Sequence, residues 1–332
     1  PTVLRVAGRD RTRARGVATL LHGNEPSGVR ALHAWLASGA PPAVDLVCFV
    51  GAVEAALHPP GFAFRMLPGR RDLNRCFAPP FDADAEGQVA GEALRLLREA
   101  GCEALLDLHN NTGHNPAYGV TCLADAACMN LAAFFGERLV ASDLALGALT
   151  EATARDFPSV TIECGRAGDP AADATALAGL ARYAALERIE TRRVLAPRMV
   201  VLERPLRVQA LPDVTLAFGD APAPGADLTL AGDIDRHNFE LLLPGVPVGW
   251  IGARGGWPIE ARGADGADVS RDFFEIRGGL LATRRASVPI MMTTDPAIAK
   301  SDCLFYLVRP REERTGYAAR TGRAGRPLEE PR

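Results

Sequence analysis

The sequence is short of lysine and has no regular cysteine pattern. Lys300 is the only lysine among 37 basic residues, a bias toward arginine that says nothing about function. The seven cysteines are odd in number and scattered, and no two of them form a C-x-x-C pair. This distribution argues against a disulfide framework and favours a reducing compartment, so we expect a cytoplasmic protein.

Long hydrophobic runs are absent as well. No apolar stretch approaches the roughly 20 residues of a membrane-spanning helix, and the N-terminal stretch PTVLRVAGRDRTRARG lacks the apolar core of a signal peptide. A formal net charge of -3 suggests neither nucleic acid nor a membrane surface as a partner. We expect a small-molecule substrate, and the sequence leaves a homo-oligomer open.

What is present describes an ordinary globular protein of two domains. Apolar residues make up 48% and charged residues 23% of a chain of 332 residues, which is long enough to bury two cores. In residues 1–193, short apolar runs alternate with helical periodicity, which predicts an α/β sheet covered by helices on both faces. The expected strands are 16–23, 44–51, 103–109 and 159–165, and the expected helices are 27–39, 86–101, 129–140 and 174–189.

From about residue 194 the pattern changes. Short strand-like runs are broken by Gly and Pro, so residues 194–310 are predicted to form a smaller, β-rich domain. The stretch from Arg309 to Arg332 carries seven arginines and four glutamates with almost no large apolar residues. We expect residues 311–332 to form a mobile tail, with a basic docking arm as the alternative.

Polar residues that can bind a metal stand where three of the expected strands end. His22 and Glu25 follow one strand, Asp107 and His109 close another, and Glu163 closes a third. Sites in open α/β sheets form just beyond the C-terminal ends of strands, so these side chains are expected to meet. Two imidazoles and one carboxylate leave a tetrahedral zinc with its fourth position open, as in hydrolytic sites.

His22, Glu25 and His109 are therefore candidate ligands for one zinc ion per chain. The three-residue step between the first two lets a single turn present both. Asp107 projects to the same face of its strand as His109 and would support that imidazole. Taken singly, each cluster is better explained as a polar turn after a buried strand, but together they favour the metal site.

Glu163 is the candidate general base. It ends an apolar strand in the sequence VTIECG, where a charge is costly unless it has a partner or a task. A metal-bound water needs a nearby base, and Glu163 fits that role.

The stretch GRRDLNRCF is rich in arginine. Asn74 and Arg75 offer an amide and a planar guanidinium fork suited to a substrate carboxylate. Arg65, Arg70 or Arg71 could face a developing oxyanion; we assign Arg65 to this catalytic role and Arg71 to substrate binding. The alternative is a basic surface loop without a function.

The blocks HGNEPSG, DLNRCF, DLHNNTG and VTIECG, in this order, resemble the succinylglutamate desuccinylase/aspartoacylase family, a branch of the zinc carboxypeptidase-like hydrolases. The resemblance runs from about Ala18 to Glu187 and resumes more weakly from Asp235 to Gly245. His-x-x-Glu alone is a weak motif, but four blocks in order are a strong signal.

The resemblance implies a zinc carboxypeptidase-like mixed sheet with helices on both faces and a C-terminal β domain that narrows the site entrance. It makes His22, Glu25 and His109 the zinc ligands. Glu163 becomes the general base and acid, and Asn74 and Arg75 become the substrate contacts.

The sequence departs from the family's pattern in the residues that set specificity. Family members often carry Arg-Tyr shortly before the Asp-Leu-Asn-Arg block, but FRMLPGRRDLNR has no tyrosine. Aspartoacylases also grip the amino-acid part of the substrate with an arginine and a tyrosine. The nearest equivalents here are Arg155, two residues out of step, and Met291. We expect the chemistry to be retained and the specificity to differ from that of aspartoacylase.

We predict a zinc-dependent amidohydrolase that cleaves the amide or ester bond of a small N-acylated amino acid or a related carboxylate-bearing amine. A zinc carboxypeptidase acting on peptides would share the metal site and differ in the width of its entrance. An inactive small-molecule binding protein on the same fold is the alternative of another class, and it would not need Glu163 as a base.

Overall fold

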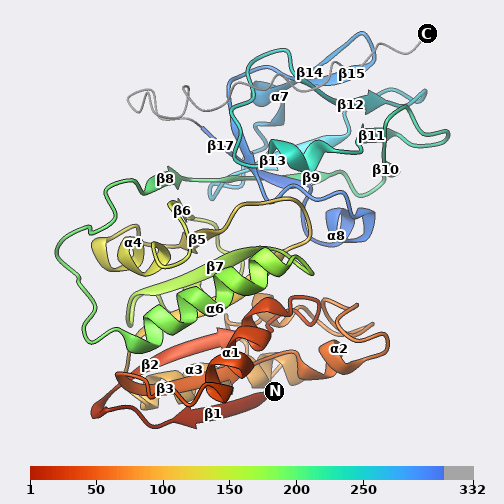
Figure 1. The fold of residues 1–332 in the computed structure, drawn as a ribbon. Coiled ribbons are helices and arrows are strands. Elements are labelled where there is room, and N and C mark those ends of the chain that lie inside the picture. Colours follow the sequence, from red (N-terminus) through yellow and green to blue (C-terminus); the bar gives the residue numbers. More distant parts are fainter. Residues whose placement is uncertain (310–332) are drawn as a thin grey trace. The chain divides into compact units, whose positions relative to one another are not determined.

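The computed structural model describes residues 1–309, and the chain forms two compact units (Figure 1). The first comprises Pro1–Asn111 and Ala117–Val201. The second comprises Thr112–Pro116 and the described residues from Leu202 onward. The tail predicted for residues 311–332 lies outside the described residues.

The first unit is built on one eight-stranded sheet in the order β1-β3-β2-β4-β7-β5-β6-β8. Strands β3, β2, β4 and β7 run parallel, whereas β1 pairs antiparallel with β3 and β5 pairs antiparallel with β7. The predicted α/β class with a mixed sheet is thereby confirmed. The strands are β1 Thr2–Val6, β2 Asp10–Thr19, β3 Val44–Val50, β4 Cys102–Asn111, β5 Tyr118–Thr121, β6 Arg138–Ala141, β7 Ser159–Arg166 and β8 Val200–Glu203.

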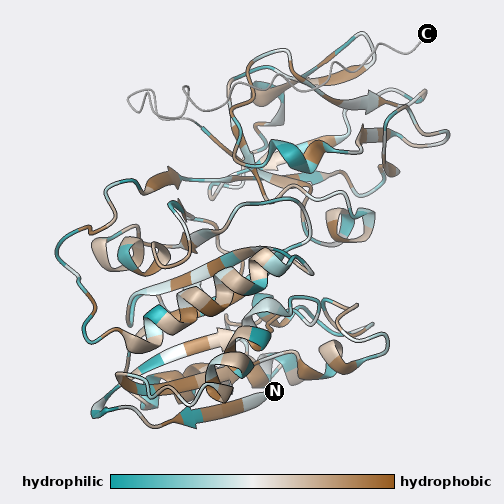
Figure 2. Ribbon diagram, viewed as in Figure 1, coloured by the Kyte–Doolittle hydropathy of each residue, from teal (hydrophilic) through white to brown (hydrophobic). Residues whose placement is uncertain are grey.

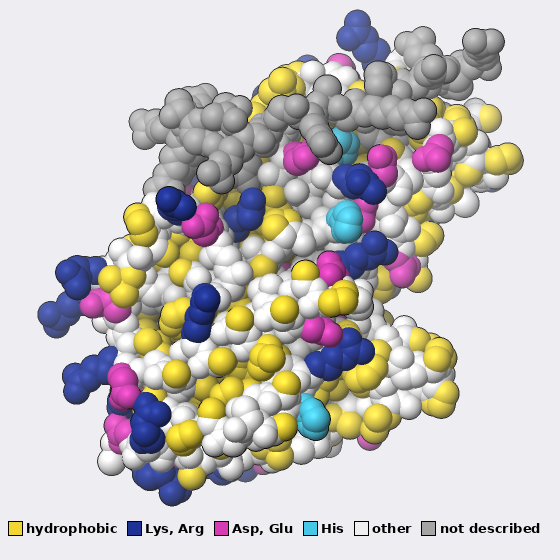
Figure 3. Space-filling model, viewed as in Figure 1, with side chains coloured by type: hydrophobic (Ala, Val, Ile, Leu, Met, Phe, Trp, Pro, Cys, Tyr) yellow, Lys and Arg dark blue, Asp and Glu magenta, His cyan; other side chains and the backbone are white. Residues whose placement is uncertain are grey.

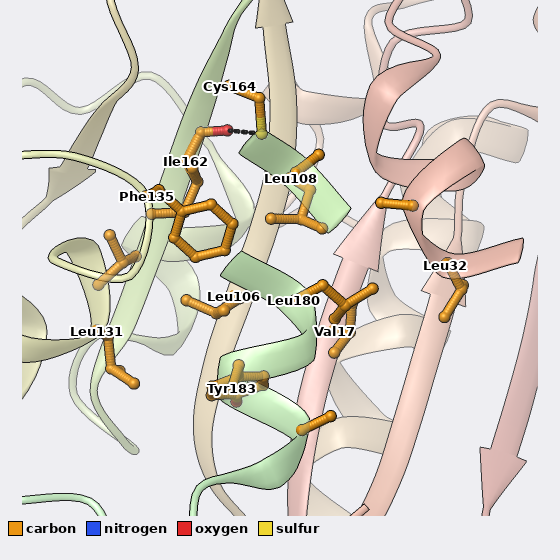
Figure 4. Close-up of a cluster of buried hydrophobic side chains, with 14 of the residues drawn as sticks. Val17, Leu32, Leu106, Leu108, Leu131, Phe135, Ile162, Cys164, Leu180 and Tyr183 are labelled. Carbon is orange, nitrogen blue, oxygen red and sulfur yellow. Dashed lines mark hydrogen bonds between the residues drawn. The ribbon is translucent and has the colours of Figure 1, made fainter. Parts of the chain in front are cut away.

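Helices cover both faces of this sheet. Alternate residues of β2 point to opposite faces: Val17 belongs to the apolar cluster under α1 and α6, and Ala18 to the cluster under α3. Val17, Leu106 and Leu180 meet in the first cluster (Figure 4). The helices are α1 Ser27–Ala37, α2 Val53–Leu57, η1 Leu73–Arg75, α3 Ala85–Glu99, α4 Ala126–Ala132, α5 Leu149–Thr153 and α6 Pro170–Ala185.

The helix predicted over residues 129–140 is wrong. Helix α4 ends at Ala132, and the chain continues into strand β6. Between them lies Gly136, where a Cβ atom would come 2.6 Å from the carbonyl oxygen of Ala117. The backbone of Gly136 packs directly against that of Ala117, and the chain turns here instead of continuing the helix. Periodicity missed it because the end of a buried helix and a short buried strand give the same apolar pattern.

The second unit is rich in β-structure. It contains a five-stranded sheet, β10-β11-β12-β15-β14, and a four-stranded sheet, β13-β9-β17-β16. Apolar side chains such as Val208, Leu230 and Phe305 are buried in its own core. Its elements are β9 Leu206–Ala210, β10 Leu216–Gly219, β11 Leu228–Ala231, η2 Ile234–His237, β12 Pro247–Ile251, β13 Ile259–Arg262, α7 Ser270–Phe273, β14 Phe274–Arg277, β15 Leu280–Thr283, β16 Val288–Ile290, α8 Pro296–Ser301 and β17 Phe305–Val308.

The elements of the first unit combine apolar and polar residues. Hydrophobic residues recur along the strands and helices of the first unit (Figure 2). Basic and acidic side chains lie interspersed on the visible face (Figure 3). On α3, Arg95 forms ion pairs with Glu92 and Glu99. Among the residues that the structure describes, none of the helices has the length and apolarity needed to cross a membrane.

Candidate metal centre

The turn after β2 presents two of the candidate ligands. Gly23 sits at its middle, where a Cβ atom would come 2.6 Å from the carbonyl oxygen of Phe64, so the close approach requires glycine. The turn closes with a hydrogen bond of 3.2 Å from the backbone N–H of Glu25 to the carbonyl oxygen of His22. As a result His22 Nδ1 lies 2.8 Å from Glu25 Oε1.

The third candidate ligand and the candidate base lie on neighbouring strands. His109 of β4 and Glu163 of β7 are register partners in the parallel ladder, so their side chains leave the sheet on the same face. Asp107 precedes His109 by two residues and shares that face. All three side chains are buried.

Three donor atoms converge at this edge of the sheet. Nδ1 of His109 lies 2.8 Å from Glu25 Oε2, and the ligand atoms of His22, Glu25 and His109 lie within 4.8 Å of one another. Within residues 1–309 this is the one group of three or more His, Cys, Asp or Glu side chains with such spacing. Two imidazole nitrogens and a carboxylate oxygen are ligands that catalytic zinc sites use, so the residues fit that metal.

A second carboxylate holds each imidazole at its far nitrogen. His22 Nε2 lies 3.1 Å from Asp72 Oδ1, and His109 Nε2 lies 2.9 Å from Asp107 Oδ2. A carboxylate that accepts a hydrogen bond from Nε2 leaves Nδ1 as the nitrogen that can bind a metal. The expected contact of Asp107 with His109 is present. Sequence reasoning missed Asp72, although it opens the DLNRCF block.

Buried opposite charges stabilise one another in this cluster. Although burial opposes ionisation, His22 and His109 hold the pKa of the Glu25 carboxyl well below its usual range. Burial likewise opposes charge on His109, but Asp107 and Glu25 raise the pKa of this imidazole. The site therefore favours positive charge on His109, and a bound cation would take the place of that proton.

Arg65 approaches the donor set. Its Nη1 atom lies 3.9 Å from Glu25 Oε1, while Nε and Nη2 lie 3.0 and 2.8 Å from Asp72 Oδ2. Although burial opposes ionisation of Asp72, His22 and then Arg65 hold the pKa of its carboxyl well below its usual range. Asp72 thus joins an imidazole and a guanidinium at one edge of the site.

Arg70 and Arg71 are engaged at the start of α3. Arg70 Nε donates to Glu86 Oε1 at 2.6 Å, and Arg71 Nη2 donates to Asp84 Oδ1 at 2.8 Å. Both arginines line a cavity of about 200 Å³ to which Arg65 also contributes. The assignment of Arg71 to substrate binding stays a prediction.

Asn74 and Arg75 occupy the short helix η1. The backbone N–H of Asn74 donates to Asp72 Oδ1 at 2.8 Å, and its side-chain oxygen accepts a hydrogen bond of 3.0 Å from the backbone N–H of Leu149. The amide oxygen is thereby used within the fold, which makes the amide N–H groups the atoms suited to a ligand. Arg75 Nη1 donates to the carbonyl oxygen of Asn74 at 3.0 Å. Their contact with substrate stays a prediction.

Glu163 is a buried carboxyl with a perturbed acidity. Burial raises its pKa to about 8, an effect that the neighbouring His109 opposes. Oε2 of Glu163 accepts a hydrogen bond of 2.8 Å from Asn111 Nδ2, a partner that sequence reasoning missed. A group with a pKa near the working pH can both take and return a proton.

Arg155 and Met291 are the positions where the sequence departs from the family's pattern. Arg155 lines a cavity of about 220 Å³ with Ser159, the first residue of β7, whereas Glu163 lies toward the other end of that strand. Met291 belongs to the second unit, and its backbone has a left-handed φ of 59°.

Several solved structures share the fold of this chain. A product-bound structure of the ectoine utilization protein EutE (DoeB) from Ruegeria pomeroyi is 19% identical, with a TM-score of 0.57, over 93% of this chain and 88% of the other. A succinylglutamate desuccinylase/aspartoacylase from Rhodobacter sphaeroides is 14% identical, with a TM-score of 0.61, over 94% and 88%. The succinylglutamate desuccinylase from Chromobacterium violaceum is 15% identical, with a TM-score of 0.61, over 94% and 89%.

At these identities the likeness establishes the fold. No protein-family model matches the chain, and no curated protein matches its sequence. The solved structures, in contrast, confirm the predicted resemblance to the succinylglutamate desuccinylase/aspartoacylase proteins at the level of the fold.

Proposed function

We propose that this chain, which has the fold of the succinylglutamate desuccinylase/aspartoacylase proteins, is a zinc-dependent hydrolase of small N-acylated amino acids or related carboxylate-bearing amines. It would cleave an amide or ester bond. The observation that carries the proposal is the convergence of His22, Glu25 and His109 beside the buried Glu163. Solved structures of the same fold support it, because they include succinylglutamate desuccinylases.

The residues of the site divide the chemistry among them. A zinc ion held by the two imidazoles and the Glu25 carboxylate would lower the pKa of a water to near neutrality. Glu163 takes the proton from the attacking water and returns it to the leaving amine. Arg65 brings positive charge to within 3.9 Å of Glu25 and would stabilise negative charge developing on the acyl oxygen.

Substrate recognition falls to the DLNRCF block. The amide of Asn74 and the guanidinium of Arg75 would hold one carboxylate of the amine part and so orient the scissile bond. A second substrate carboxylate needs another cation in place. Arg155 lies at the start of β7, which supports a substrate with a single carboxylate on its amine part.

One experiment on the full chain tests this proposal. Elemental analysis should find about one zinc per chain, as a site formed by His22, Glu25 and His109 requires. Amine release should then be seen with N-acyl amino acids rather than with dipeptides. Release mainly from dipeptides would indicate a carboxypeptidase, and bound zinc without turnover would indicate a binding protein. A chain purified without zinc, which zinc does not activate, would contradict the proposal.

We further propose a cytoplasmic location. All seven cysteines are free thiols, as a reducing compartment maintains them.

A further inference from the structure

The strand register gathers polar side chains on both sides of Glu163. His109 of β4 is its partner in the parallel ladder, and Tyr118 of β5 is its partner in the antiparallel ladder on the other side. Asn111 follows His109 by two residues on β4, so it starts from the same face of the sheet. Four side chains from three adjacent strands therefore stand next to one another.

Two hydrogen bonds join three of these side chains in a chain. Asn111 Nδ2 donates to Glu163 Oε2 at 2.8 Å, and the hydroxyl of Tyr118 donates to Asn111 Oδ1 at 3.3 Å. Tyr118 is 0% exposed and Asn111 is 5% exposed, so water competes little for either bond.

The direction of these two hydrogen bonds follows from the groups at either end, the Glu163 carboxylate and the Tyr118 hydroxyl. In the ionised form that acts as a base, Glu163 can only accept hydrogen bonds, and the Asn111 amide turns Nδ2 toward it. Its oxygen then points the other way, and the tyrosine hydroxyl is the donor that satisfies it. Without that donor, a buried amide oxygen would be left unpaired at a cost comparable to a lost hydrogen bond.

We propose that Asn111 is a positioning residue for the general base Glu163, and that the Tyr118 hydroxyl sets the orientation of the Asn111 amide. The inference rests on the proposed function, because it gives Asn111 a role only if Glu163 moves a proton. Fixing Oε2 leaves Oε1 as the oxygen that meets the attacking water.

A neutral amide suits this task better than a charged group. A guanidinium in its place would pair with Glu163 and lower its basicity. A carboxylate would add a further negative charge beside Glu25 and Asp107, which are already buried nearby. An amide orients the base without neutralising it.

The test is a double-mutant cycle in the full-length, zinc-loaded chain, assayed on the best N-acyl amino acid. Asn111→Ala should lower kcat about 10- to 100-fold, in the range seen when the support of a site residue is removed. Tyr118→Phe should lower kcat about 3- to 10-fold, the effect of one neutral hydrogen bond. KM and zinc content should stay near wild type in both. Because the hydroxyl acts through Asn111, the double variant should be no slower than Asn111→Ala.

Tyr183→Phe is the matched control. Tyr183 is also 0% exposed in the first unit, and its hydroxyl donates to the carbonyl oxygens of Gly16 and Ala104. Its loss should lower stability and leave kcat unchanged.

The outcomes separate the two proposals. A wild type without hydrolase activity would overturn both. An active wild type with unchanged kcat in Tyr118→Phe, or with additive losses in the double variant, would overturn only the inference. Should Asn111→Ala fail to fold, Tyr118→Phe against Tyr183→Phe still decides, because each removes one hydroxyl.

Discussion

His109 and Glu163 are register partners in the parallel β4–β7 ladder, so they lie side by side on one face of the sheet. Neighbouring strands lie about 4.8 Å apart, so a candidate metal ligand and a candidate base are held side by side by the sheet itself. The turn that carries His22 and Glu25 completes the donor set from the adjacent strand β2. The geometry of this candidate site depends on strand register as well as on the turn after β2.

His109→Ala should yield a folded protein that purifies with much less zinc, because one of three protein ligands is lost. Elemental analysis with circular dichroism measures both. His33→Ala is a suitable control, since His33 lies exposed on α1. Zinc content like that of wild type in His109→Ala would remove this residue from the ligand set.

Asp72→Asn should weaken zinc binding by about 10- to 100-fold, because the carboxylate that holds His22 Nε2 is replaced by a neutral amide. Competition with a chelator measures this on the full chain. Asp84→Asn breaks the ion pair with Arg71 at the start of α3 and should leave zinc affinity unchanged. Equal affinities in both variants would show that Asp72 does not support the metal.

Glu163→Gln should retain zinc and lose turnover by about 10²- to 10⁴-fold, the usual contribution of a general base. The amide keeps the size of the side chain and cannot take a proton. Steady-state rates and zinc content, both measured on one preparation of the variant, test this prediction. Turnover within a few-fold of wild type would make Glu163 structural.

In the metal-free protein, Glu163 should make stability fall as pH rises. Burial raises its pKa from 4.5 to about 8, so the folded chain holds this proton more tightly than the unfolded chain. Its stabilising contribution is complete below pH 4.5 and is lost as pH rises through 8. Glu163→Gln should therefore gain stability relative to wild type over this interval, by at most about 1.4 kcal/mol per pH unit. Urea unfolding of both proteins measures this between pH 4.5 and 8. A constant difference in their free energies of unfolding across that range would contradict the prediction.

N-acetylaspartate should be a poor substrate, and N-acetyl amino acids with an apolar or neutral side chain should be better. Asn74 and Arg75 can hold one carboxylate, but Arg155 lies at the start of β7, away from the Glu163 end. An unpaired second carboxylate in a partly desolvated pocket costs at least about 1–3 kcal/mol. Steady-state rates on matched N-acetyl amino acids decide this, and a first rank for aspartate would contradict it.

Some features of the fold and site could be predicted from sequence, whereas others depended on contacts that no local pattern encodes. His22, Glu25, His109 and Glu163 stand at the ends of apolar runs, and parallel strands bring such ends together. The helix expected over residues 129–140 shows the limit, because only packing at Gly136 separates its end from a strand.

By itself the sequence determined the α/β class and the residue types that meet at the sheet edge, because periodicity and strand-end position are local properties. Only the tertiary structure decided the partners of those residues. Asp72 reaches His22 across 50 residues and Asn111 reaches Glu163 across 52. Arg65, rather than Arg70 or Arg71, approaches Glu25. These contacts follow from strand order, register and the path of one loop, which the local pattern of side chains does not contain.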